Sequence, residues 1–556
     1  MRPLSYAVVI TVTLAVVSSC RTSQQQQTGR ALFRSTKVAA STSCDATVAP
    51  PGMMFPSNFD YPQSESTIHG WPNGHRQRLH AYCLFAGLNY PWMPSTPTWQ
   101  TWKTTTQAFL YQYNQWPSPP PANALGGVVA QHSVPINVAR SRAVGATGKI
   151  VNPAPTYYVN AAVANNPIYQ SAGCLQAQTD KNGKLLGYTL RDGQVFQSNG
   201  DIMVAAVSYS PFALQDILGR NLYNGAILDQ QLPLTKTTTA NNMKPMGQYS
   251  VVLKVMLWPV SGTSPTALPY WNWNSNPPGS SSDGQYAGYE MQNFWTNAVA
   301  ITNGPAPSSV TYLYGVLDSS GTTQLGPNTY QNPQAVPLNR FYGKTYSDAD
   351  LGALSPCDQA LLDASAFWAY NRGFRGGDSL VMIAMHIMTK EQSDWTFQSA
   401  WWHPDALSCT SNTRFCQDRP ASVPGGDTTY KNYNMSTTYG QQEQSTNPNY
   451  YAPPDTKQPA TVWPVAYNPY IELAASHPIT TNCMNCHHRA AWPPNSELFP
   501  DKKDGGRVSA YLQTSSPNPN VLEVFTSSDP AFNGLLTVDS MWAVSDRAGY
   551  PTNTKP

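Results

Sequence analysis

Two cysteines and a histidine near the end of the chain have the spacing of a haem attachment site. Residues 483–487 read Cys-Met-Asn-Cys-His, and C-x-x-C-H is the pattern of covalently attached c-type haem. Cys483 and Cys486 would bond to the two vinyl groups on one edge of the porphyrin, while His487 would bind the iron as its proximal ligand. A short helical turn beginning near Cys483 would place all three side chains on one side. The pattern therefore predicts one covalent haem.

A zinc site and a redox disulfide are the other interpretations of the cysteine pair. Zinc would need a second pair of ligands, but no cysteine follows Cys486. The adjacent Cys486 and His487 are poorly placed to bind one tetrahedral ion together, although His477 and His488 are nearby. A thioredoxin-like pair would open a βαβ unit, and no such pattern surrounds it. Haem remains the leading prediction.

The ligand opposite His487 decides the class of function. A methionine or histidine there gives a six-coordinate electron carrier, whereas an open position permits catalysis or gas binding. Met541 lies downstream, where small cytochromes carry a distal methionine, and His386 lies in an apolar segment. A core methionine and a hydrogen-bonded core histidine are the ordinary interpretations of these residues. The distal position therefore stays open between Met541, His386 and no ligand.

The start of the chain resembles a lipoprotein signal peptide. Arg2 precedes an apolar run at residues 6–17, which is short for a membrane span but suits a signal peptide. The run ends in Val-Ser-Ser-Cys, which resembles a lipobox with Cys20 as the lipidated residue. An ordinary signal peptide with a chance cysteine is the alternative. We expect an exported protein of a Gram-negative bacterium, lipid-anchored in the periplasm or at the outer membrane, which Arg21 would permit.

The composition favours strands and turns and gives no reason to expect nucleic-acid binding. The chain has 33 basic and 31 acidic residues, a net charge of +2, and therefore no electrostatic footprint for nucleic acid. Charged residues make up only 12%, whereas 49 prolines, 37 glycines and 31 tyrosines are typical of turns and strands. We expect a mainly β fold with decorating helices (α+β).

Six cysteines remain after the lipid and haem assignments: Cys44, Cys83, Cys174, Cys357, Cys409 and Cys416. An even number in an exported chain permits three disulfides, whose connectivity the sequence does not determine. Only Cys409 and Cys416 are close enough in sequence to predict as a pair.

The sequence divides into four predicted regions. They are a signal peptide at 1–20, a disordered tether at 21–54, a β-rich body at 55–460 and a mostly helical or loop haem segment at 461–556. In the body, apolar runs at 379–388 and 395–402 flank a short polar turn and predict a core β-hairpin. Residues 249–260 predict a buried strand.

Other segments of the body carry helix, turn and loop patterns. Helical spacing covers 75–89, and Ser-Pro pairs at 210–211 and 355–356 predict capped helix starts. Pro97 is predicted to begin another helix, and residues 408–459 to form a long surface loop. Three charged residues fall in the hairpin turn, where solvation is more typical than acid–base chemistry. They are Lys390, Glu391 and Asp394.

Several short motifs, taken in order, resemble a known group of proteins. The motifs are Ala384-Met385-His386, Thr389-Lys390-Glu391, Trp395, Trp401-Trp402, Asn468-Pro469, Cys483-Met484-Asn485-Cys486-His487 and Arg489-Ala490. From about residue 165 to the end, the chain resembles bacterial exported proteins described only as cytochrome c family. The resemblance implies a single covalent haem in the periplasm or at the cell surface, and it implies no substrate.

We therefore expect an exported monohaem c-type cytochrome that transfers electrons to or from an unknown partner protein. One alternative is a haem-dependent oxidoreductase, such as a peroxidase or oxygenase, with a substrate pocket in the β-rich body. The size of the body favours that alternative, because carrying electrons needs less protein. Another is a surface binding module with a structural haem. No nucleophile elbow, phosphate loop or zinc-protease motif is present, so no catalytic residue is predicted.

Overall fold

The computed structural model describes residues 43–109, 158–271, 295–439, 466–471, 483–493 and 532–549, with short gaps inside several of these ranges. The predicted signal peptide with Cys20, most of the tether, Cys409 and Cys486 lie outside the described residues. The described residues belong to one compact unit that starts at Ser41. None of their helices is long and apolar enough to cross a membrane.

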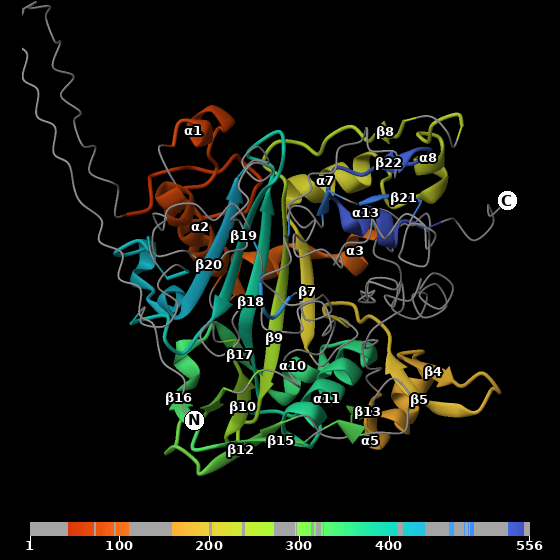
Figure 1. The fold of residues 1–556 in the computed structure, drawn as a ribbon, viewed down its shortest axis with the longest axis vertical. Helices are drawn as coiled ribbons and strands as arrows, with labels where there is room; N and C mark the ends of the chain where they lie inside the picture. The colour runs from red at the N-terminus through yellow and green to blue at the C-terminus, as the bar shows by residue number, and fades with distance from the viewer. Residues whose placement is uncertain are drawn as a thin grey trace, which may run out of the picture. The chain divides into compact units, whose positions relative to one another are not determined.

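A large antiparallel sheet forms the centre of the fold (Figure 1). Its main path runs β20-β19-β18-β9-β7-β3, with β17 pairing β18 and β6 pairing β7. The strands are β3 (Lys103–Thr104), β6 (Gln197–Ser198), β7 (Val204–Tyr209), β9 (Val251–Val260), β17 (Gly343–Thr345), β18 (Ser379–Thr389), β19 (Thr396–Trp402) and β20 (Tyr433–Tyr439). The fold is mainly β with decorating helices, as predicted.

The predicted hairpin and buried strand are confirmed at the middle of this sheet. β18 pairs with β19 on one side and with β9 on the other, and every residue of β18 is buried. A strand buried on both faces is apolar nearly throughout, which explains the uninterrupted apolar run in its sequence. Because side chains alternate between faces, His386 and Met388 share one face while Ile387 and Thr389 share the other.

Helices pack around the central sheet (Figure 1). Two of them begin at the Ser-Pro pairs that were predicted as helix starts. The predicted caps are confirmed: Ser210 accepts from the amide of Ala213, and Ser355 accepts from the amide of Asp358. The helices are α1 (Glu65–His69), α2 (Gly74–Asn89), α3 (Thr105–Phe109), α5 (Ala161–Ala164), α6 (Pro167–Ser171), α7 (Pro211–Gly219), α8 (Gly225–Asp229), α10 (Asp348–Gly352), α11 (Pro356–Tyr370) and α13 (Trp542–Arg547).

Short strands form small sheets around the centre. β10 (Thr266–Pro269), β11 (Ala298–Ile301) and β16 (Gln334–Val336) form one of three strands, and β21 (Ala491–Trp492), β22 (Leu536–Thr537) and β8 (Asn241–Asn242) form another. The two-stranded pairs are β1 (Pro91–Met93) with β2 (Thr96–Pro97), β4 (Leu175–Thr179) with β5 (Leu185–Leu190), β12 (Ser309–Tyr312) with β15 (Asn328–Gln331), and β13 (Val316–Leu317) with β14 (Gln324–Leu325).

Two hydrophobic cores lie against the central sheet. The larger contains buried residues of α2, α11 and the small sheets. The second joins the C-terminal residues to one end of the sheet and to α7. Its members include Val252, Met388, Phe397, Cys483, Trp492, Leu536, Met541 and Val544. The C-terminal part of the chain is therefore built into the body, and β22 pairs in parallel with β8.

Three local predictions are wrong. Part of the predicted loop at 408–459 forms the buried edge strand β20, because its alternating Tyr, Met, Ser and Thr side chains pair with β19. Thr96–Pro97 is a strand rather than a helix start. The fold begins within the predicted tether: Cys44 is disulfide-bonded to Cys83 of α2, and Met53 is fully buried.

Cys174 and Cys357 could not be paired from the sequence. Cys174 is bonded to Cys357 across a separation of 183 residues, which no spacing rule reveals. Cys416 is also disulfide-bonded, and the predicted partner Cys409 lies outside the described residues.

Candidate functional site

The first cysteine of the motif is buried in the second core. Cys483 is 3% exposed, and its amide donates to the carbonyl of Ala466 at 2.7 Å. Cys486 lies outside the described residues. Of the predicted attachment residues, the structure therefore describes Cys483 and His487, each in a helical conformation.

The ring of His487 is oriented by a backbone carbonyl. Its Nδ1 lies 2.8 Å from the carbonyl oxygen of Ser540. A carbonyl oxygen only accepts, so Nδ1 carries the proton and Nε2 keeps its lone pair. Burial lowers the pKa of His487 to about 4, although the Ser540 carbonyl acts in the opposite direction. At neutral pH the ring therefore offers Nε2 as a metal ligand, because the carbonyl bonded to Nδ1 fixes that tautomer.

The turn that supplies this carbonyl is strained and firmly held. Asp539 and Ser540 have φ values of 47° and 64°, a left-handed conformation that costs about 1–3 kcal/mol for each residue other than glycine. The Asp539 carboxylate accepts from Lys390 Nζ at 2.8 Å and from the amide of Met246 at 2.7 Å. Its carbonyl accepts from Trp395 Nε1 at 2.8 Å. These bonds maintain the turn beneath His487.

The prediction of a solvated hairpin turn is therefore wrong for two of its three charged residues. Lys390 is 5% and Glu391 1% exposed, whereas Asp394 is exposed as predicted. Glu391 lies 3.3 Å from His80 Nε2 and accepts from the amide of Gln63 at 2.6 Å. The turn is buried by an N-terminal segment that contains Gln63 and His80 and by a C-terminal segment that contains Asp539. The sequence of the turn itself does not indicate this burial.

His386 faces His487 from the central sheet. The ring centres lie 5.5 Å apart with the planes inclined by 36°. His386 is 5% exposed, and neither of its ring nitrogens has a hydrogen-bond partner among the residues that the structure describes. Burial, reinforced by His487 and by Lys254, holds its pKa well below the ordinary value. A buried polar group without a partner is rare and requires an explanation such as a ligand.

The distance between the two rings is close to what one iron would need. Metal–imidazole bonds of about 2 Å place two rings on opposite sides of a metal with centres roughly 6 Å apart. Phe397 lies beside both rings, with centres 5.7 Å from His386 and 5.5 Å from His487. The apolar Phe397 side chain cannot supply a hydrogen bond to either histidine. Two imidazoles at this distance could bind one iron, but the Phe397 ring is nearly equidistant from both and lies where a porphyrin between them would extend. Phe397 must therefore move before a haem can occupy the space between His386 and His487.

Met541 is placed differently. It is 2% exposed within the second core, and it directly follows Ser540, whose carbonyl bonds to Nδ1 of His487. The backbone of Met541 therefore begins on the Nδ1 side of the ring, away from the nitrogen that would bind iron. Of the two candidate distal ligands, His386 is the one that the structure brings ring to ring with His487.

Sequence reasoning missed three residues of this site. Ser540 acts through its backbone, and Asp539 holds the turn. Lys254 lies opposite His386 in the β9–β18 pair. Of these three residues, only Lys254 is conspicuous in the sequence, because it is the single charged residue of the apolar strand β9.

Comparison with other proteins does not identify the chain. No protein-family model matches it, and searches of curated proteins and of solved structures find no significant match. In the ranges that the structure describes, no group of three or more histidine, cysteine, aspartate or glutamate side chains could hold a metal ion together.

Proposed function

We propose that the protein is an exported monohaem c-type cytochrome that transfers electrons. Cys483 and Cys486 would attach the haem, and His487 would be the proximal ligand. The observation that carries the proposal is the buried His386. Its ring nitrogens have no hydrogen-bond partner in the described part of the chain, and its ring centre lies 5.5 Å from that of His487. Iron with two histidine ligands is saturated, which favours electron transfer over substrate binding.

The protein's own residues would hold and tune the cofactor. The Ser540 carbonyl fixes the tautomer of His487 and raises its basicity. Phe397 lies against both imidazoles, and it would turn aside to admit a porphyrin between them. Lys254 adds positive charge on the face of the sheet that carries His386. When bound, the haem would supply a one-electron redox centre.

Absorption and mass measurements on the fully matured protein test this proposal. We expect a mass of polypeptide plus one haem, and a low-spin ferrous spectrum that carbon monoxide does not change. The Cys483→Ala/Cys486→Ala variant should lose pigment on a denaturing gel, whereas the exposed control His69→Ala should keep it. A colourless protein of bare polypeptide mass would overturn the haem. A high-spin iron that binds carbon monoxide would favour the oxidoreductase alternative.

We also propose export and lipid anchoring through Cys20, on the sequence of the first twenty residues. The Cys20→Ser variant should then leave the membrane fraction and fail to incorporate labelled palmitate. Labelling equal to that of the unchanged protein would refute the lipobox.

A further inference from the structure

A second site lies at the other end of β19, away from the two facing histidines. A pocket of about 490 Å³ is lined by Tyr270, Gln334, Arg340, His403, Pro404, Asp405, Leu407 and Ser408. His403 directly follows β19, whereas Phe397 lies near the start of that strand. At ~3.3 Å per residue the two are about 20 Å apart along the chain. The pocket is therefore separate from the proposed haem site.

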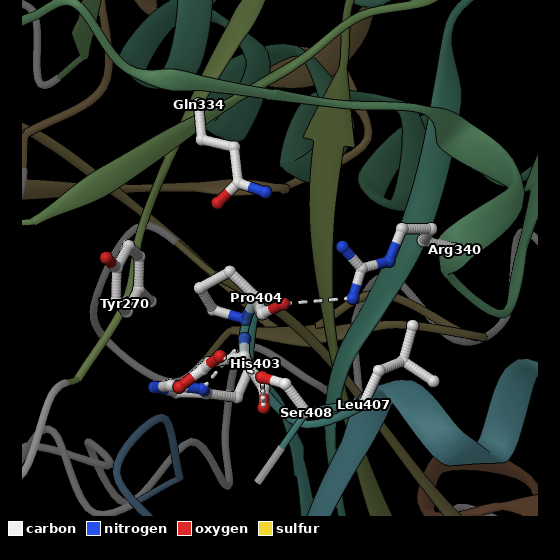
Figure 2. A pocket seen from close by; sticks show the side chains of 8 residues that line it. Tyr270, Gln334, Arg340, His403, Pro404, Leu407 and Ser408 are labelled. Carbon is white, nitrogen blue, oxygen red and sulfur yellow. Dashed lines mark hydrogen bonds between the residues drawn. The ribbon is translucent and has the colours of Figure 1, made fainter. Parts of the chain in front are cut away.

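Arg340 is held with part of its guanidinium directed at the pocket. Its Nε donates to the amide oxygen of Asn432 at 2.8 Å, and its Nη2 donates to the carbonyl of Pro404 at 3.0 Å. The guanidinium also lies 5.8 Å from the centre of the Trp402 ring. Figure 2 shows it reaching into the same space as the Gln334 amide. These contacts fix the orientation of the guanidinium group. Among the described residues, its Nη1 has no hydrogen-bond partner.

No ion pair neutralises Arg340 in the described part of the chain, although the acidic residue Asp405 also lines the pocket. Both bonded acceptors are neutral oxygens. Burial alone lowers the pKa of its guanidinium. A partly desolvated cation is stabilised when an anion with two oxygens meets its planar donors. The pocket therefore favours a carboxylate.

Besides Arg340, the lining contains one acidic residue, Asp405, and otherwise neutral groups. His403 accepts from the amide of Asp405 at 3.1 Å, and burial lowers its pKa to about 4, so it adds no positive charge at neutral pH. The Ser408 hydroxyl lies within hydrogen-bond distance of both the backbone carbonyl and the carboxylate of Asp405, and a carboxylate can accept more than one hydrogen bond. Tyr270 lies across the pocket from Arg340 in Figure 2. Hydroxyl groups on a ligand would therefore find both donors and acceptors.

We propose that this pocket binds a small carboxylate that also carries hydroxyl groups, such as a sugar acid. Arg340 would hold the carboxylate, and Gln334, Tyr270 and Asp405 would bond to the hydroxyls. The inference is independent of the haem, because no pocket residue contacts the facing histidines in the contacts described above.

Titration calorimetry of the holoprotein with sodium D-glucuronate tests the site, with D-glucose and sodium butyrate as matched probes. We expect glucuronate to bind more tightly than either. Arg340→Gln should weaken binding about 10–100-fold, the equivalent of a charge-assisted hydrogen bond. The same change at the exposed Arg375 should leave binding unchanged.

A second variant guards against a folding defect in Arg340→Gln. Gln334 is exposed, so Gln334→Glu should keep the thermal midpoint while its added charge weakens glucuronate binding. Glucose binding as well as glucuronate would overturn the role of Arg340. Butyrate binding as well as glucuronate would overturn the hydroxyl contacts. No binding of any of the three probes would overturn the site.

Discussion

His386 and His487 face each other at 5.5 Å between ring centres, although one lies in a central strand and the other follows the C-terminal cysteine motif. The backbone carbonyl of Ser540 accepts a hydrogen bond from Nδ1 of His487 and so fixes the orientation of that ring. Each histidine is thus placed by a different part of the chain. The pair is a relationship that only the folded structure creates.

Removing His386 should leave the iron without a protein ligand opposite His487. His386→Ala is expected to convert the low-spin spectrum to a high-spin one and to permit carbon monoxide binding, because the variant has no imidazole opposite His487. Optical spectra of the ferrous protein measure the change. Met541→Leu is the matched control and should remain low-spin. If the two variants behave the other way round, Met541 is the distal ligand.

Loosening the turn beneath His487 should raise the reduction potential. Asp539→Ala removes the acceptors of Lys390 and Met246 that hold the strained turn. A weaker bond to the Ser540 carbonyl makes His487 a less basic ligand, which favours ferrous iron. A redox titration measures the midpoint. Asp394→Ala changes an exposed aspartate of the nearby hairpin turn and should leave the potential unchanged; an equal shift in both would refute the role of the turn.

Removing a positive charge near the iron should lower the potential. Lys254 acts electrostatically on both His386 and His487. A unit charge about 10 Å away at an effective dielectric of about 20 contributes ~1–2 kcal/mol, or tens of millivolts for one electron. We expect Lys254→Met to lower the midpoint by about that amount. Lys184→Met, at an exposed hairpin, serves as control, and no difference between the two would contradict the prediction.

The free energy of unfolding at low pH should depend on Asp378. Burial by itself would raise the pKa of this carboxyl, but bonds from Arg372 and from the amides of Gly262 and Arg375 outweigh it and hold the pKa below its ordinary value. A group with a lowered pKa in the folded state stabilises it above the unfolded pKa of about 3.9 and ceases to do so as the pH falls through the folded pKa.

Asp378→Asn should therefore lower the free energy of unfolding by roughly 2 kcal/mol at pH 7, as expected for a charged hydrogen-bond network. The difference from the unchanged protein should shrink as the pH falls below about 4. Urea unfolding between pH 7 and pH 2 measures it. Asp394→Asn, at an exposed aspartate of the hairpin turn, should have little effect at neutral pH. A difference for Asp378→Asn that persists unchanged at pH 2 would refute the linkage.

The sequence by itself determined the elements whose cause is local. Ser210 and Ser355 cap helices because their hydroxyls reach the first amides of the next turn. The apolar runs of β9, β18 and β19 form strands because each residue is buried on one face or the other. The spacing from Cys483 to His487 likewise carries the haem prediction without help from the fold.

Only the tertiary structure decided which distant groups meet. Lys390 and Glu391 look solvated in sequence, yet segments from both ends of the chain bury them. His386 could be an ordinary core residue until it faces His487, and Arg340 could be any surface charge until Asn432 and Pro404 fix it in a pocket. Contacts between residues hundreds of positions apart depend on how sheets and loops pack, and spacing along the chain does not encode that packing.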